Sequence, residues 1–171
     1  KESFWVFSGD EVELKITNRD RPSILILASD PGTQDINSAL YSSVLNRTLR
    51  LINSKHNLPG GIIADEFPTI YIHKIDNVVA TARSNKVAVL LGLQEIPQLR
   101  QFYKKEVADT ISAIVGNILS GSARDKNTLE WLEKLFGKIK QKSYSQSISQ
   151  QGTTTSINEK MDFMIPAGKI A

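Results

Sequence analysis

The sequence predicts an α/β fold in which a parallel sheet carries helices on both faces. Two observations lead to this prediction. Short, uninterrupted runs of Ile, Leu and Val occupy residues 23–28, 61–64 and 87–91, and continuous apolar runs are typical of strands covered on both faces. Between and after these runs, apolar residues recur at the three- and four-residue spacing of helices. Strand and helix therefore alternate along the chain, as a parallel sheet with crossover helices requires.

The helices that complete this order are expected from their apolar stripes. These stripes are Ile36, Leu40, Val44 and Leu51; then Ile75, Val78, Val79 and Ala82; then Val107, Ala108, Ile111 and Ile114. A fourth, short strand is expected at residues 118–121. Asp125 then begins a last helix as its N-terminal cap, and Gly137 ends it.

Three regions follow from this order of elements. Residues 1–22 alternate loosely between polar and apolar and predict short entry strands, and residues 23–137 form the α/β core. Residues 138–171 are rich in Ser, Gln, Thr and Lys and predict either an edge ribbon or a mobile loop, followed by a tail. The length of 171 residues predicts that residues 1–171 belong to a single domain.

Composition excludes several kinds of site. The chain has no cysteine, which excludes disulfides, thiolate zinc sites, iron–sulfur clusters and cysteine nucleophiles. Two histidines leave little for a histidine metal centre or a histidine-based triad. A net charge of +3 permits nucleic-acid binding without arguing for it. The apolar runs are far shorter than the roughly 20 residues that cross a bilayer, so these residues are expected to be soluble.

Adjacent acids at a strand end give the strongest chemical signal. Asp65 and Glu66 directly follow the apolar run at residues 61–64, the pattern of a Walker B element in a P-loop NTPase. In that interpretation Asp65 holds Mg²⁺ through its water shell, and Glu66 orients or deprotonates the attacking water. The alternative is a polar strand end that begins a loop.

Two further polar residues fit the same chemistry. Gln94 follows the next strand, where an amide contacts the γ-phosphate or the attacking water; the alternative is an ordinary residue before a helix. Arg83 lies beside the apolar stripe of the intervening helix, where it either completes a neighbouring subunit's site or is a solvated surface arginine.

Three lysines in the polar ribbon alternate with other residues. Lys138, Lys140 and Lys142 share one side of an extended chain and could follow DNA phosphates by charge alone. The alternative, which we favour, is a sheet edge that lysines protect from unwanted pairing.

One expected element is missing from the sequence. No GxxxxGK[ST] phosphate loop occurs, so these residues have no cradle for the phosphates of ATP. We therefore expect no ATP hydrolysis by this chain alone, and no ATP or Mg²⁺ bound to it.

Several motifs taken together resemble a known family. In order along the chain they are Ile62-Ile63-Ala64-Asp65-Glu66-Phe67-Pro68-Thr69, Ala80-Thr81-Ala82-Arg83-Ser84-Asn85-Lys86, Val89-Leu90-Leu91-Gly92-Leu93-Gln94-Glu95, Gln98-Leu99, Ala108-Asp109-Thr110-Ile111 and Thr128-Leu129-Glu130-Trp131-Leu132. This series resembles the C-terminal half of the motor domain of conjugative type IV coupling proteins, hexameric ATPases that bring relaxase-bound DNA to a type IV secretion channel. The variant is similar to coupling proteins of Bacteroides-type mobilisation elements and conjugative transposons.

The resemblance implies a three-layer, RecA-like P-loop NTPase fold that is incomplete here. It places the Walker B acids on Asp65 and Glu66, the phosphate-sensing glutamine on Gln94 and an arginine acting across the subunit interface on Arg83. It also implies ATP and Mg²⁺ as cofactors of the intact protein; DNA, relaxase and other relaxosome proteins, and the secretion channel as partners; and a site of action at the cytoplasmic face of the bacterial inner membrane. The phosphate-loop half, membrane anchor and helical cap domain of the family are expected upstream.

The resemblance has a structural consequence and leaves one alternative function. In a RecA-like sheet the phosphate-loop strand lies between the strand at residues 87–91 and the strand at residues 118–121. Without it, exposed apolar edges favour self-association, strand swapping or displacement of the last strand. The alternative function is a non-catalytic module that recognises relaxosome proteins or secretion substrates.

Overall fold

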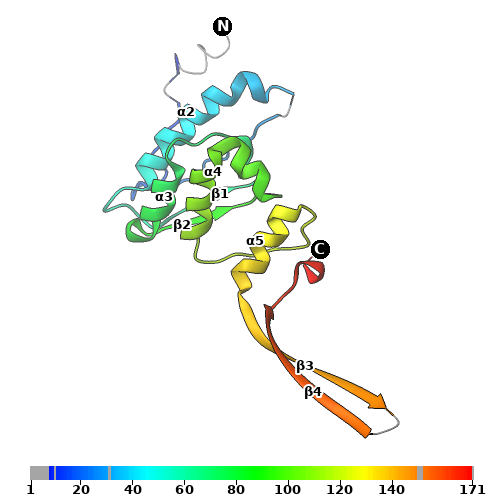
Figure 1. The fold of residues 1–171 in the computed structure, drawn as a ribbon. Coiled ribbons are helices and arrows are strands. Elements are labelled where there is room, and N and C mark those ends of the chain that lie inside the picture. The colour runs from blue at the N-terminus through cyan, green and yellow to red at the C-terminus, as the bar shows by residue number, and fades with distance from the viewer. Residues whose placement is uncertain (1–7, 10, 31, 150–151, 171) are drawn as a thin grey trace. The chain divides into compact units, whose positions relative to one another are not determined.

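Two short parallel strands form the centre of the first part of the chain in the computed structural model, which describes residues 8–9, 11–30, 32–149 and 152–170 (Figure 1). β1 (Gly60–Ala64) and β2 (Val87–Leu91) pair in parallel, from Gly60 opposite Val87 to Ala64 opposite Leu91. The strands predicted at residues 61–64 and 87–91 and their parallel direction are confirmed. The chain divides into two compact units, Lys1–Ile118 and Leu119–Ala171, whereas the predicted α/β core extends to residue 137.

Three helices cover one face of this strand pair. They are α2 (Gln34–Ile52), α3 (Ile75–Ala82) and α4 (Ile96–Ile114). Together with the loop after β1 they bury a core of Leu49, Phe67, Ile72, Ile75, Leu99, Tyr103, Ala108 and Ile111. From the strands, Ile62, Ala64 and Leu91 pack against that core. Over the residues that the structure describes, no helix has the length and apolar composition needed to span a membrane.

Helix α4 begins earlier than its predicted stripe and is interrupted. Pro97 occupies its first turn, where the fixed φ of proline suits a helix and its missing N–H is no loss. Lys104 leaves the helical conformation with φ 62° and ψ 158°. An ion pair spans the interruption, because the Arg100 guanidinium lies 2.9 Å from Oδ1 of Asp109.

The prediction that the strands are covered on both faces is wrong. Along both strands burial alternates, and the outward residues Ile63 and Leu90 are 80% and 57% exposed. These two residues lie opposite each other in the register, so they form one continuous apolar surface.

Two other predicted strands do not form among the described residues. Residues 23–28 and 118–121 adopt no regular structure, and Ile24, Ile26 and Leu119 are 88%, 82% and 97% exposed. An apolar run becomes a strand only when a neighbouring strand accepts its backbone hydrogen bonds, and here neither run has such a neighbour. The described part of residues 1–22 likewise contains no strand, and residues 1–7 and 10 lie outside the described residues.

The second unit consists of a helix followed by a long hairpin. α5 (Lys126–Phe136) begins where Asp125 accepts a hydrogen bond from the Thr128 backbone N–H at 2.8 Å, and Gly137 follows its end, both as predicted. β3 (Lys138–Ser149) and β4 (Gly152–Phe163) pair in antiparallel fashion (orange in Figure 1). Of the two predictions for this region, the ribbon is confirmed and the loop is wrong. A short 3₁₀ helix, η3 (Ala167–Lys169), ends the described chain.

Candidate functional site

The carboxyl ends of β1 and β2 bring three predicted site residues together. Asp65 and Glu66 directly follow β1, and Gln94 follows β2 after two intervening residues. The Gln94 side-chain amide donates a hydrogen bond to Oε1 of Glu66 at 3.3 Å. All three side chains are exposed, so a ligand can reach them from solvent. The arrangement places two carboxylates and an amide at one edge of the strand pair, where ligands of parallel α/β sheets bind.

Backbone hydrogen bonds fix these two strand ends against each other. The Gly92 N–H donates to the Ala64 carbonyl, and the Phe67 N–H donates to the Gly92 carbonyl, both at 2.8 Å. Gly92 lies close to the Asp65 side chain: a Cβ atom on it would be 3.1 Å from Oδ1 of Asp65, so a larger residue would require that carboxylate to shift. Glu66 has a left-handed conformation, with φ 47°, that turns the chain out of β1 into the 3₁₀ helix η1 (Phe67–Thr69).

The two carboxylates have different surroundings. Oδ1 of Asp65 accepts the Glu66 backbone N–H at 3.0 Å, which orients the Asp65 side chain, whereas the Glu66 carboxylate meets Gln94. Among the described residues no group of three or more His, Asp or Glu side chains comes close enough to enclose a metal ion. Proteins often bind Mg²⁺ through one or two carboxylates, with waters and substrate phosphates filling the other positions. Asp65 and Glu66 present two carboxylates at this edge of the strand pair.

A buried tyrosine, Tyr103, forms hydrogen bonds with the loop that follows Asp65 and Glu66. The Tyr103 hydroxyl donates to the Ile70 carbonyl at 2.7 Å and accepts the Ile72 N–H at 2.9 Å. Its ring stacks on Phe67, the residue after Glu66, with ring centroids 4.7 Å apart. Burial raises the pKa of the Tyr103 hydroxyl, so this group stays protonated and able to donate. Tyr103 lies four residues after Leu99 and extends the apolar stripe of α4, but this spacing does not predict its hydrogen bonds to the loop.

The structure does not bring Arg83 to this group. Arg83 begins the 3₁₀ helix η2 (Arg83–Asn85), which precedes β2, so it lies at the amino end of the strand pair. At about 3.3 Å per residue, the length of β2 separates it from the carboxyl ends by roughly 16 Å. Its side chain is exposed.

Lys138, Lys140 and Lys142 share one face of the β3–β4 hairpin, as their spacing predicts. The register adds residues that the sequence analysis did not place there. Tyr144 continues the same alternation along β3, and β4 contributes Phe163, Met161, Glu159 and Ile157 as cross-strand partners. The sequence does indicate that Tyr144 shares this face, because it lies two residues after Lys142 on an extended chain.

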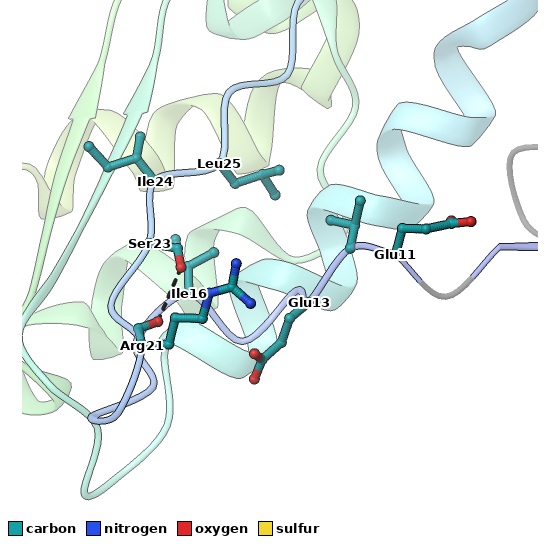
Figure 2. Close-up of a pocket in the computed structure, with 8 residues that line it drawn as sticks. Glu11, Glu13, Ile16, Arg21, Ser23, Ile24 and Leu25 are labelled. Atoms are coloured by element: carbon teal, nitrogen blue, oxygen red, sulfur yellow. Dashed lines mark hydrogen bonds between the residues drawn. The ribbon is translucent and has the colours of Figure 1, made fainter.

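A cavity of about 430 Å³ lies elsewhere in the first unit, between two irregular segments (Figure 2). Its lining comprises Glu11, Val12, Glu13, Ile16, Arg21, Ser23, Ile24 and Leu25. The Ser23 hydroxyl donates to the Arg21 carbonyl at 3.1 Å, the dashed line in Figure 2. The cavity includes none of the predicted site residues.

A protein-family model matches most of the chain. The model, described as the TraM recognition site of TraD and TraG, matches residues 59–170. It therefore includes both the strand ends and the hairpin. No protein with a curated description matches the chain significantly.

Solved structures similar to this chain include several of a conjugative coupling protein. They include the unbound bacterial conjugative coupling protein TrwBdeltaN70, with 18% identity and a TM-score of 0.64. They also include two complexes of the plasmid coupling protein TrwB. The complex with the ATP analogue ADPNP has 17% identity and a TM-score of 0.62, and the complex with ADP and Mg²⁺ has 17% identity and a TM-score of 0.55. Each match covers 81% of this chain and 32% of the other, so this chain spans about a third of the TrwB chains. The likeness confirms the predicted RecA-like α/β fold in incomplete form.

Proposed function

Because this chain belongs to the family described as the TraM recognition site of TraD and TraG, we propose that it is the C-terminal part of the motor of a conjugative DNA-transfer ATPase. In that role it supplies acidic and amide side chains to the ATP site. The observation that carries the proposal is the 3.3 Å hydrogen bond from Gln94 to Glu66, which joins the carboxyl ends of two neighbouring parallel strands.

Each side chain has a distinct role in this proposal. Asp65, which its own loop orients, binds the waters of Mg²⁺. Glu66 orients the attacking water and accepts its proton, and Gln94 donates to that water or to the terminal phosphate. When bound, ATP would supply the phosphoryl group, and Mg²⁺ would neutralise the negative charge of the phosphates. The TrwB complexes with ADPNP and with ADP and Mg²⁺ support nucleotide binding by the intact protein.

Arg83 acts on a different site in this proposal. Its position at the opposite end of the strand pair suits a residue that reaches the ATP site of a neighbouring subunit in a homohexamer. Removing it should lower hydrolysis by the assembled ring without weakening nucleotide binding to a single subunit.

Substitution of Glu66 in the intact coupling protein tests the catalytic assignment. Glu66→Gln keeps the size of the side chain and removes its basicity, so nucleotide binding should persist while hydrolysis and DNA transfer are abolished. Glu106→Gln, an exposed acid on α4, is the matched control and should leave all three unchanged. Full turnover by Glu66→Gln would end the assignment.

The sequence has no phosphate loop, which leads to a second test. The 171-residue chain alone should hydrolyse no ATP, and activity should appear only when the phosphate-loop half of the protein is supplied. Hydrolysis by the purified chain would contradict this division of the site.

A second candidate function is protein recognition, and the description of the family model favours it. In this alternative the chain selects relaxase or accessory proteins for transfer at the cytoplasmic face of the inner membrane. A pull-down of the 171-residue chain with relaxosome proteins tests it, and retention without nucleotide would support it.

A further inference from the structure

We propose that the lysine-bearing edge of the β3–β4 hairpin binds an extended, acidic segment of a protein partner as a third strand. The proposal rests on the protein-recognition function and names the surface that would carry it. It does not depend on the proposed nucleotide site. The juxtaposition that carries it is a row of lysines on a strand whose outer backbone edge is open.

The edge itself provides the backbone groups for binding. Among the described residues β3 pairs only with β4, so its other edge presents unpaired N–H and C=O groups. An extended peptide can add to such an edge, with main-chain hydrogen bonds giving affinity and alternate side chains giving specificity. Residues 138–144 are all exposed.

The face beside this edge carries an excess of positive charge. Lys142 forms an ion pair with Glu159 across the hairpin at 3.2 Å, while Lys138 lies 4.6 Å from the centre of the Phe163 ring. Lys140 lies opposite Met161, a side chain without charge. Glu159 is thus the only acid facing three lysines in the part of the hairpin that the structure describes.

Exposed apolar side chains lie next to the lysines on the same face. Tyr144, Ile157 and Met161 are 68%, 59% and 53% exposed, and Tyr144 lies directly opposite Ile157. Tyrosine and methionine are enriched in protein interfaces. A strand added beside β3 would place its alternate side chains next to Lys138, Lys140, Lys142 and Tyr144. For a strand added parallel to β3, the matching segment therefore has acidic residues at three alternate positions, followed by an apolar residue.

Charge disfavours the other occupants. A second copy that paired antiparallel to β3 around Lys140 would bring lysines opposite lysines, which is destabilising. Against a nucleic acid, Glu159 would face phosphates, and residues 138–163 contain no arginine. The lysines thus disfavour pairing of this edge with a second copy of β3 and favour an acidic strand instead.

A labelled peptide binding to the 171-residue chain tests the proposal. The probe is an acetylated peptide of about seven residues, matching the length of residues 138–144, with Asp at three alternate positions, Val between them and Leu at the end. Fluorescence anisotropy should show binding that weakens with salt, and replacing each Asp by Asn should weaken it at least about tenfold.

Two charge-reversal variants locate the surface. Lys140→Glu should weaken binding at least about tenfold, whereas Lys160→Glu, on the opposite face of the hairpin, should change it less than about twofold. Circular dichroism before and after melting checks that both variants fold, and Lys140→Gln repeats the test without adding a negative charge. Equal binding by the wild type and Lys140→Glu would overturn the proposal.

Two further probes separate the alternatives. Methylating alternate backbone nitrogens of the peptide removes the donors that an added strand needs, so binding should be lost; retained binding would overturn strand addition. Tighter, Lys140-dependent binding of single-stranded oligothymidylate than of the peptide would show a nucleic-acid surface instead. If relaxosome proteins do not bind the chain at all, the recognition function fails, whereas equal retention by Lys140→Glu overturns only this surface.

Discussion

Tyr103 links the helical core to the loop that carries Glu66, so its hydroxyl should contribute to stability. Tyr103→Phe keeps the ring stack but leaves the buried Ile72 N–H without its acceptor. A buried polar group without a partner costs about 1–3 kcal/mol, and the free energy of unfolding should fall by this amount. Denaturant unfolding measures it. Tyr71→Phe, at an exposed ring on the same stack, is the control and should lower stability by less than about 0.5 kcal/mol.

Gln94 should act on turnover more than on nucleotide binding. In the intact protein Gln94→Leu removes the amide that meets Glu66, and loss of one positioned donor typically costs roughly a hundredfold in rate. ATPase assays beside a nucleotide-binding measurement separate the two effects. Gln101→Leu, on the exposed surface of α4, should leave turnover unchanged. An unchanged kcat for Gln94→Leu would remove Gln94 from the site.

The sequence predicts the acid and amide group because its members follow neighbouring parallel strands, whose carboxyl ends must meet at one edge. It does not predict the hydrogen bond between Gln94 and Glu66, which depends on the left-handed turn at Glu66 and on the Gly92 contact. The sequence does not predict the role of Tyr103, because a single aromatic residue on a helix stripe has the same pattern as an ordinary core residue. Its role comes from loop carbonyl and amide groups that are distant in sequence.

The junction between α5 and β3 depends on Gly137. Its φ of 73° and ψ of −168° lie in a region that is almost exclusive to glycine, and a Cβ atom there would meet open space. Gly137→Ala should therefore lower stability by about 1–3 kcal/mol through backbone strain alone. Thermal or denaturant unfolding of the chain measures this loss.

Gly116→Ala provides the comparison for that measurement. Gly116 also has open space around a Cβ atom but no positive φ, so alanine should be neutral or slightly stabilising there. If the two alanine variants had equal stability, the helix-to-hairpin junction would not depend on a glycine at position 137.

Helices proved more predictable from this sequence than strands. The stripes that predict α2 and α3 and the end signals that predict α5 are local, since a helix satisfies its own backbone hydrogen bonds. A strand depends on a neighbour, so the apolar runs at residues 23–28 and 118–121 have the composition of strands without forming them. The hairpin was predictable only as one of two alternatives, because its polar, alternating residues suit a ribbon and a loop equally well.

The exposed face of β1 and β2 should drive self-association of the isolated chain. Ile63 and Leu90 expose a continuous apolar surface in the middle of the strand pair, and burying such a surface between copies is favourable. Sedimentation velocity should show species whose size grows with protein concentration. A monodisperse monomer at every concentration would contradict this expectation.

Substitution on that face distinguishes it from other apolar surfaces of the chain. Replacing Ile63 and Leu90 together by Thr keeps a side chain suited to strands and removes apolar area, so association should weaken by at least about tenfold. The matched control replaces Leu135 and Met164, which are 49% and 51% exposed in the second unit, by Thr. Equal association by both double variants would show that the strand face does not hold the copies together. Association that only the control weakens would place the contact in the second unit instead.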